Sequence, residues 1–122
     1  MKGRFVVEFE DLDVWKRSAR LSTDIYRHFA KSTDWGFKDQ ITRSGLSIPS
    51  NIAEGFERLS NKECIQFLSY AKGSTGELRT QIHIGISIGY IESQIGQSWI
   101  SETQELSKML GGLIQTRKRR IP

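Results

Sequence analysis

Apolar side chains recur every three or four residues along most of this chain, and that spacing constrains the possible folds more than any other feature. Side chains at these spacings share one face of a helix. Residues 11–31 form such a face with Leu12, Trp15, Ala19, Ser22, Tyr26 and Phe29. Segments 37–58, 61–90 and 98–117 have the same repeat, so the sequence predicts four amphipathic helices.

Short polar loops separate these segments, including 32–36 and 93–96. Amphipathic helices joined by short loops are typical of an up-down-up-down bundle. We therefore predict an all-α fold, an antiparallel four-helix bundle, as a single domain over residues 1–122. An N-terminal arm (1–10) precedes the helices and a basic tail (118–122) follows them.

One stretch of the third predicted helix has a conflicting pattern. Residues 82–88 alternate isoleucine with smaller or polar residues, which is the repeat of a β-strand. The available partner is the stretch 5–9, and two strands alone are marginally stable. We therefore predict a helix here, in which Gly85 and Gly89 mark a close helix–helix approach.

A proline lies inside the second predicted helix, in the segment Ser47-Ile48-Pro49-Ser50-Asn51-Ile52-Ala53-Glu54-Gly55. Proline removes a helical hydrogen bond and crowds the preceding turn, so we expect a bend or local irregularity at Pro49. The carbonyl of Gly45 loses its partner, and nearby polar side chains or water can satisfy it. We expect Gly55 and Gly73 to permit close backbone approach.

Basic residues are concentrated at the C-terminus. The net charge is +4 and residues 117–120 are all cationic, so the remainder of the chain is neutral. A mildly basic protein can bind an anionic partner such as RNA, although a solvated tail that complements the last helix dipole would look the same. A second basic group lies on the outer face of the first helix. The candidate nucleic-acid-binding residues are Lys16, Arg17, Arg20, Arg117, Lys118, Arg119 and Arg120.

Several functional classes find no support in the sequence. The single Cys64 excludes an internal disulfide and a multi-cysteine zinc site. Its place near a helix start could lower the thiol pKa, or the side chain is packed and inert. Asp24 and His28 can interact on one helix face, but together with His83 they make no convincing metal site. We expect no metal, no cofactor and no catalytic residue, and hence no enzyme.

The chain also lacks targeting and membrane patterns. No apolar run approaches the ~20 residues needed to cross a membrane. The first residues do not form a signal peptide, because their apolar stretch is short and acidic residues follow at once. We expect a cytoplasmic protein.

Several segments together resemble a known bacterial family. They are residues 9–16 (Phe-Glu-Asp-Leu-Asp-Val-Trp-Lys), 40–43 (Gln-Ile-Thr-Arg), the proline segment 47–55, and 67–74 (Phe-Leu-Ser-Tyr-Ala-Lys-Gly-Ser) followed by Glu77-Leu78. In this order and spacing they resemble the four helix bundle protein family, whose genes lie in intervening sequences of 23S rRNA genes or stand alone. The chain departs from the family pattern at Ser44-Gly45, where two small apolar residues are commoner.

The resemblance covers roughly residues 9–114. It implies an antiparallel four-helix bundle that assembles into a homopentameric ring. The accessory variability determinant of diversity-generating retroelements is similar in bundle and ring, and that protein works with nucleic acid and a reverse transcriptase.

A polar stripe accompanies the apolar face of the second helix and consists of Arg43, Ser47, Asn51 and Glu54. If the second and third helices are antiparallel about a turn near residue 60, Glu77 lies level with Arg43. We therefore predict an Arg43–Glu77 ion pair within a partly buried structural network that fixes helix register. The alternative is a ligand or RNA pocket.

The patterns and the resemblance favour a non-enzymatic, self-associating binding or scaffold protein. The expected partners are further copies of the chain, with the pentamer taken from the resemblance, and rRNA or another nucleic acid. Trp35, Phe37 and Trp99 lie near loops or helix ends and could stack bases, or pack in the core or between subunits. The alternative function is a protein-interaction adaptor for a nucleic-acid enzyme such as a reverse transcriptase.

Overall fold

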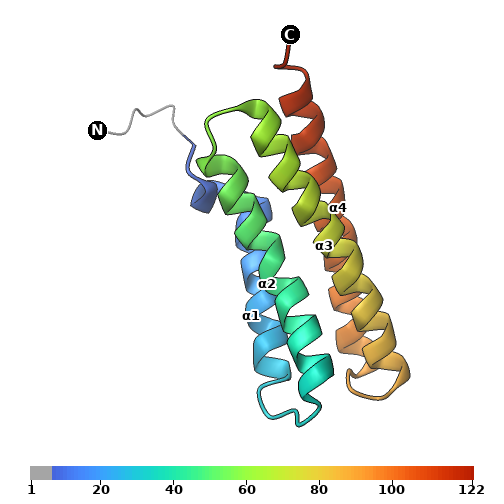
Figure 1. Cartoon of the computed structure of the whole chain (residues 1–122). Helices are drawn as coiled ribbons and strands as arrows, with labels where there is room; N and C mark the ends of the chain where they lie inside the picture. Colours follow the sequence, from blue (N-terminus) through green and yellow to red (C-terminus); the bar gives the residue numbers. More distant parts are fainter. Residues whose placement is uncertain (1–6) are drawn as a thin grey trace.

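The computed structural model describes residues 7–122. Its elements are a short 3-10 helix η1 (Phe9–Asp11) and the α-helices α1 (Asp13–His28), α2 (Trp35–Glu57), α3 (Asn61–Ser87) and α4 (Ser93–Lys118). Successive helices run in opposite directions along one bundle (Figure 1). No strand occurs among the described residues. The predicted all-α, up-down-up-down four-helix bundle is confirmed.

Several helix ends differ from the predicted ones. α1 ends at His28 and α3 ends at Ser87, both earlier than predicted. α4 begins at Ser93, so the predicted loop at 93–96 is wrong. The glycine in that stretch suggested a loop, but a Cβ at Gly96 would collide with the side chain of Ile86. The missing side chain thus lets the first turn of α4 pack tightly against α3.

The ambiguous isoleucine stretch is helical through Ser87, as predicted. The partner strand considered at 5–9 falls partly outside the described residues, and Phe9 begins η1 instead. The predicted N-terminal arm is likewise described only from Val7 onward.

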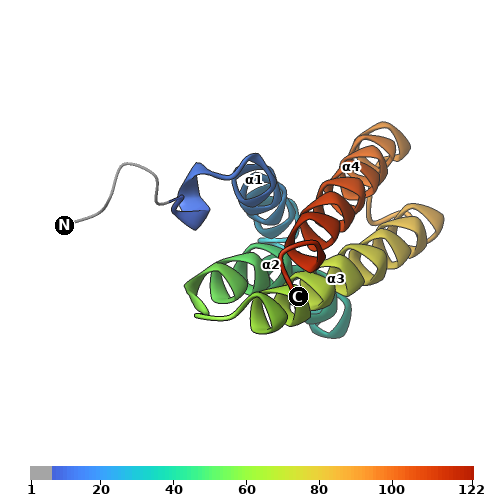
Figure 2. The same cartoon turned by 90° about the horizontal axis from the view of Figure 1, so that it is seen from above.

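The core lies between the helices and is mainly aliphatic. Seen along the bundle, α1 and α2 form one side and α3 and α4 the other (Figure 2). α3 packs extensively on both α2 and α4, whereas α1 and α4 touch over a short stretch. Each fully buried side chain of this size stabilises the fold by about 1.5–3 kcal/mol. These side chains include Ile25, Ile41, Ile48, Ile52, Leu68, Leu78, Ile82, Leu106 and Leu110.

Gly55 brings α2 and α3 together, as predicted. A Cβ at this position would lie 3.1 Å from the carbonyl oxygen of Cys64 and 3.2 Å from the Cβ of Phe67. Gly73 differs, because a Cβ there would meet nothing within 4 Å. The predicted close approach at Gly73 is therefore wrong.

Of the two glycines predicted to mark a close helix–helix approach, Gly85 does so and Gly89 does not. Gly85 is buried in α3, where an added Cβ would lie 2.5 Å from the Cδ1 of Ile91 and 3.3 Å from the ring of Phe37. Gly89 lies in the turn after α3 with φ of +80°, a backbone conformation that favours glycine. Gly89 therefore shapes the turn and marks no helix–helix contact.

α2 continues through Pro49, whose side chain is buried. Beside it, the Ser47 hydroxyl donates to the carbonyl of Ser44 at 2.8 Å, and the Asn51 amide donates to the carbonyl of Ser47 at 2.8 Å. Neither bond ends on the carbonyl of Gly45, so the predicted rescue of that carbonyl by these side chains is wrong. Both side chains instead follow the helix and reinforce its own turns.

An apolar groove of about 620 Å³ runs between the outer sides of α1 and α2. Its lining includes Trp15, Leu46, Pro49, Ala53 and Tyr26. Helical spacing predicted that Tyr26 faces the core, but its side chain is exposed in this groove. The proline segment therefore contributes to an external surface as well as to the core.

Candidate nucleic-acid interface

The α1 basic group lies level with the middle of α4, where Arg17 pairs with Glu102. The C-terminal basic group lies at the end of the bundle where α3 begins and α2 and α4 end (Figure 1). We call this end the basic end. The start of α1 and the end of α4 are neighbours there, because Leu12 and Thr116 line one shared pocket. Residues about a hundred positions apart thus contribute to one surface.

Arg117 fastens the last turn of α4 to the rest of the basic end. Its guanidinium donates to Oδ1 of Asn61 at 2.9 Å, at the start of α3. The same group lies over the ring of Phe56, 4.8 Å from the centroid, in a cation–π contact. Arg117 is half-buried and has a structural role, so it is a poor candidate for binding a phosphate.

The next three cations are exposed. Lys118 is the last residue of α4, and Arg119 and Arg120 form the turn that follows. No ion pair to any of them occurs among the described residues. The predicted tail from residue 118 therefore begins as helix, with its cations next to the negative end of the α4 dipole.

Arg17 in the α1 group is committed to a partner within the chain. Its Nε donates to Oε2 of Glu102 at 3.0 Å, its Nη2 binds the other carboxylate oxygen, and its Nη1 lies 3.6 Å from Sδ of Met109. The hydrogen bond to Glu102 raises the pKa of Arg17. Arg17 thus joins α1 to α4, while Lys16 and Arg20 remain exposed on the outside of α1.

The predicted Arg43–Glu77 ion pair does not form in the described structure. Nε of Arg43 lies 3.0 Å from Oδ1 of Asp39, one turn earlier on α2, and this hydrogen bond raises the pKa of Arg43. Arg43 and Glu77 are both exposed, because each points away from the α2–α3 contact. The predicted buried network is therefore wrong: Ser47 and Asn51 bond to their own helix, and Glu54 pairs with a neighbour described next.

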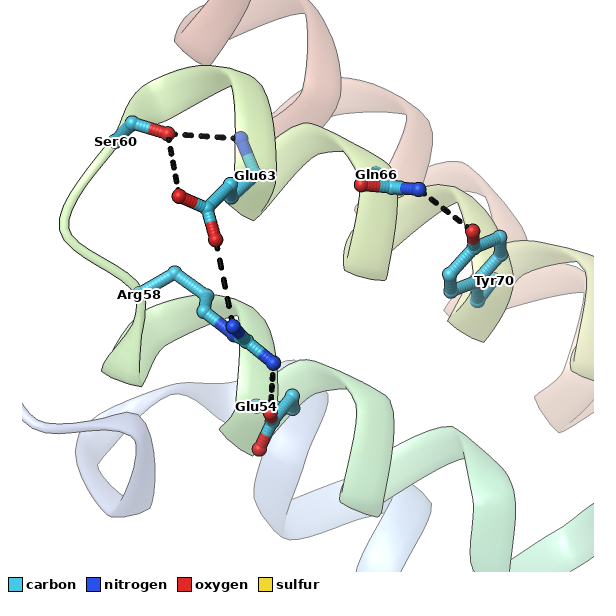
Figure 3. Close-up of polar contacts among 6 residues, drawn as sticks. All are labelled: Glu54, Arg58, Ser60, Glu63, Gln66 and Tyr70. Atoms are coloured by element: carbon cyan, nitrogen blue, oxygen red, sulfur yellow. Dashed lines mark hydrogen bonds and ion pairs between the residues drawn. The ribbon is translucent and has the colours of Figure 1, made fainter.

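The turn between α2 and α3 is fixed by a chain of polar contacts (Figure 3). The Ser60 hydroxyl accepts the backbone N–H of Glu63 at 3.1 Å and caps α3. Arg58 pairs with Glu54 through Nη2, and its Nη1 lies 3.4 Å from Oε2 of Glu63. The Arg58 guanidinium also lies 4.7 Å from the ring centroid of Phe67. Arg58 therefore links the end of α2 to the first turn of α3.

At the opposite end of the bundle, Asp34, Tyr90 and His28 form a set of hydrogen bonds that we call the polar clasp. The loop sequence indicated a cap at Thr33 or Asp34, but no pattern indicated the contacts from Tyr90 and His28. The Tyr90 hydroxyl donates to Oδ2 of Asp34 at 2.7 Å, and Oδ1 of Asp34 accepts the N–H of Phe37 at 3.1 Å as the cap of α2. The Nε2–H of His28 donates to the Tyr90 carbonyl at 2.9 Å. The clasp thus connects the α1–α2 loop with the α3–α4 turn. The hydrogen bond from Tyr90 lowers the pKa of Asp34 and raises that of Tyr90.

Replacing Asp34 with Asn is expected to weaken the fold more at neutral pH than in acid. The folded pKa of Asp34 lies below its ordinary value of 3.8, so the ionised group stabilises the protein above that value and loses this effect as pH falls through the folded pKa. Asparagine still caps a helix, but its amide nitrogen cannot accept the Tyr90 hydroxyl, so the variant removes the charge together with the hydrogen bond from Tyr90. Urea unfolding of both proteins at neutral pH and near pH 3 measures the difference, and an equal difference at both pH values contradicts the assignment.

The remaining candidates have structural roles. Cys64 is buried, and burial raises its thiol pKa, so the pKa-lowering alternative is wrong. Trp99 is buried and packs edge-on against the His28 ring, with the centroids 5.2 Å apart. Phe37 packs beside Phe29, while Trp35 is exposed beneath Nζ of Lys38.

Residues 7–122 contain neither a metal-binding cluster nor a membrane-spanning helix. No cluster of three or more His, Cys, Asp or Glu side chains in this range is arranged to hold a metal ion. None of its helices combines the length and apolar character needed to cross a membrane.

Known proteins share the sequence pattern and the fold of this chain. A family model described as 23S rRNA-intervening sequence protein matches residues 10–112. A crystal structure of a protein of unknown function from the S23 ribosomal protein family of Bacteroides thetaiotaomicron is similar, with a TM-score of 0.77 and 26% identity over 83% of this chain and 97% of that chain. No curated protein matches the chain. With most of its length matched by that family model, the chain belongs to the family of 23S rRNA-intervening sequence proteins.

Proposed function

We propose that this protein is a non-enzymatic, self-associating cytoplasmic protein that binds RNA, with ribosomal RNA as the first candidate, through its basic end. The observation that carries the proposal is the end of α4, which Arg117 holds in place. Lys118, the last residue of the helix, and Arg119 and Arg120 in the turn that follows are all exposed there. Cations held in this way bind phosphates by displacing counterions. The family description, which refers to 23S rRNA, supports an RNA partner.

Self-association strengthens such a surface. Every added copy repeats the same three exposed cations, and linked weak sites gain avidity when they bind one polyanion together. The resemblance to pentameric relatives suggests five copies. The apolar groove between α1 and α2 supports a contact with protein, because exposed apolar patches on globular proteins mark interaction surfaces.

The same groove supports a second candidate function. A protein-interaction adaptor for a nucleic-acid enzyme, such as a reverse transcriptase, needs an apolar docking surface beside a basic one. RNA affinity that depends on the basic end distinguishes the first function. Affinity for a protein partner without RNA affinity distinguishes the second.

Replacing Lys118, Arg119 and Arg120 together with alanine is expected to reduce RNA binding and its salt dependence. Each lost phosphate contact removes about 0.7 from the slope of log affinity against log salt for single-stranded nucleic acid, so the slope should fall by about two. The measurement is fluorescence anisotropy with labelled 23S rRNA fragments across a salt series. Substitution is preferable to truncation after Thr116, which would also remove the Arg117 contact with Asn61.

The matched control is a triple variant that loses the same three positive charges at positions outside the basic end. Lys31, Lys72 and Lys108 are exposed and lie outside the last turn of α4, and their combined replacement with alanine should leave most of the slope unchanged. An equal loss in both triple variants would show that net charge alone matters. If the folded protein does not bind RNA even at low salt, the proposed function is wrong and the adaptor function takes its place.

A further inference from the structure

A leucine side chain projects into solvent within the basic end. Leu59 is fully exposed, at 103% of its reference area, in the turn between α2 and α3. The side chains on either side of it have polar partners: Arg58 pairs with Glu54, and Ser60 caps α3 (Figure 3). The turn is therefore held in one shape while its apolar side chain has no contact to bury it.

Leu59 lies close to the cations proposed to bind phosphate. Phe56 and Asn61, which flank it in the chain, are the two residues that Arg117 contacts. Arg120 lies one turn beyond Arg117, because its backbone N–H donates to the Arg117 carbonyl at 3.1 Å. The basic end thus combines an exposed apolar tip with exposed cations on the adjoining helix turn.

Exposed cations and an exposed leucine together fit an RNA that offers both phosphates and accessible base faces. Cations bind the phosphates of any nucleic acid, but the faces of paired bases are hidden by stacking. Proteins recognise bases of RNA mainly in loops, bulges and single strands, and apolar side chains can insert between base steps. An anionic membrane surface would also attract cations and leucine, but a single leucine beside a few cations is a weak membrane anchor.

We propose that Leu59 makes apolar contact with an unpaired nucleobase, so that the basic end prefers RNA containing unpaired bases to fully paired RNA. This inference rests on the proposed RNA-binding function and adds the class of RNA that is bound. It also assigns different tasks to neighbouring groups: the cations of the last α4 turn supply affinity for phosphate, and Leu59 supplies the preference for exposed bases.

The test compares two RNA hairpins of equal length, one fully paired and one with a bulged 2-aminopurine, using the full chain. Leu59→Ala should weaken binding of the bulged hairpin about 3- to 10-fold, since only part of a leucine is buried against a base. Binding of the paired hairpin should not change. The wild-type protein should alter 2-aminopurine fluorescence, and Leu59→Ala should reduce that change.

Ile88→Ala is the matched control, because Ile88 is also an exposed aliphatic residue (52%) but lies at the opposite end of α3. It should leave the affinity for both hairpins unchanged. If Leu59→Ala weakens both hairpins equally or neither of them, while the last-turn cations still matter, this inference fails and RNA binding by the protein stands. If no hairpin binds at low salt, the proposed function fails as well.

Two further outcomes overturn the inference. If Leu59→Ala reduces binding to phosphatidylserine vesicles and leaves both RNAs unaffected, Leu59 belongs to a membrane contact. If light scattering shows that Leu59→Ala lowers the number of subunits, Leu59 belongs to a contact between copies of the chain.

Discussion

Replacing Leu78 with alanine is expected to lower the free energy of unfolding by about 2–5 kcal/mol. Leu78 is 0% exposed in α3, the helix that packs on both α2 and α4. The substitution removes buried apolar surface and leaves a cavity that rigid neighbouring helices can close only in part. Urea unfolding followed by circular dichroism measures the loss.

Ile84→Ala is the control for this experiment. Ile84 lies on the same helix but is 48% exposed, and alanine is a better helix former than isoleucine. Its replacement should change the stability by no more than about 0.5–1 kcal/mol. Equal effects at the two positions would mean that α3 presents a different face to the core than the structure shows.

Replacing Gly55 with valine is expected to lower the free energy of unfolding by about 1–3 kcal/mol through overpacking. The added Cβ alone would lie 3.1 Å from the backbone oxygen of Cys64, and backbone in a helix cannot rotate away as a side chain can. The branched methyl groups add to this crowding, so α2 and α3 must separate near their connecting turn. Thermal and urea unfolding both measure the effect.

Gly73→Val separates crowding from helix propensity. Both glycines lie inside helices, but a Cβ at Gly73 would meet nothing within 4 Å. Valine has a slightly higher helix propensity than glycine, so this variant should be neutral or more stable by a few tenths of a kcal/mol. A comparable loss at both positions would contradict the close approach at Gly55.

The fold was predictable because the information that specifies it is local. Apolar residues at helical spacing show which face of each segment is buried, and short loops leave antiparallel packing as the simple arrangement. The cap of α3 is local as well, because the Ser60 hydroxyl accepts the N–H of Glu63 three residues later. Glycine was harder to interpret: Gly96 lies inside a helix, because a missing Cβ can serve packing as well as a turn.

The polar contacts were much less predictable, because they depend on the rotation and register of helices distant in sequence. Arg43 pairs with Asp39, one turn earlier on its own helix, while Glu77 is exposed on α3. The pairing of Arg17 with Glu102 joins residues 85 positions apart, and nothing in the local sequence specifies it.

The same limit applies to the candidate interface. Counting cations identified both basic groups, but composition could not separate Arg17 and Arg117, which hold helices together, from the exposed cations beside them. Leu59 carried no sequence signal of function. One leucine in a turn is ordinary until its exposure and its neighbours are known.

The position of Arg117 has a consequence for how this protein can diverge. Arg117 contacts Asn61 and Phe56, whereas the three cations after it are exposed. Substitutions in the final turn can therefore retune the attraction to a polyanion while the bundle stays intact. Under the proposed function, the residue that stabilises the fold and the residues that bind the ligand are adjacent but separate, so ligand preference can change without a loss of stability.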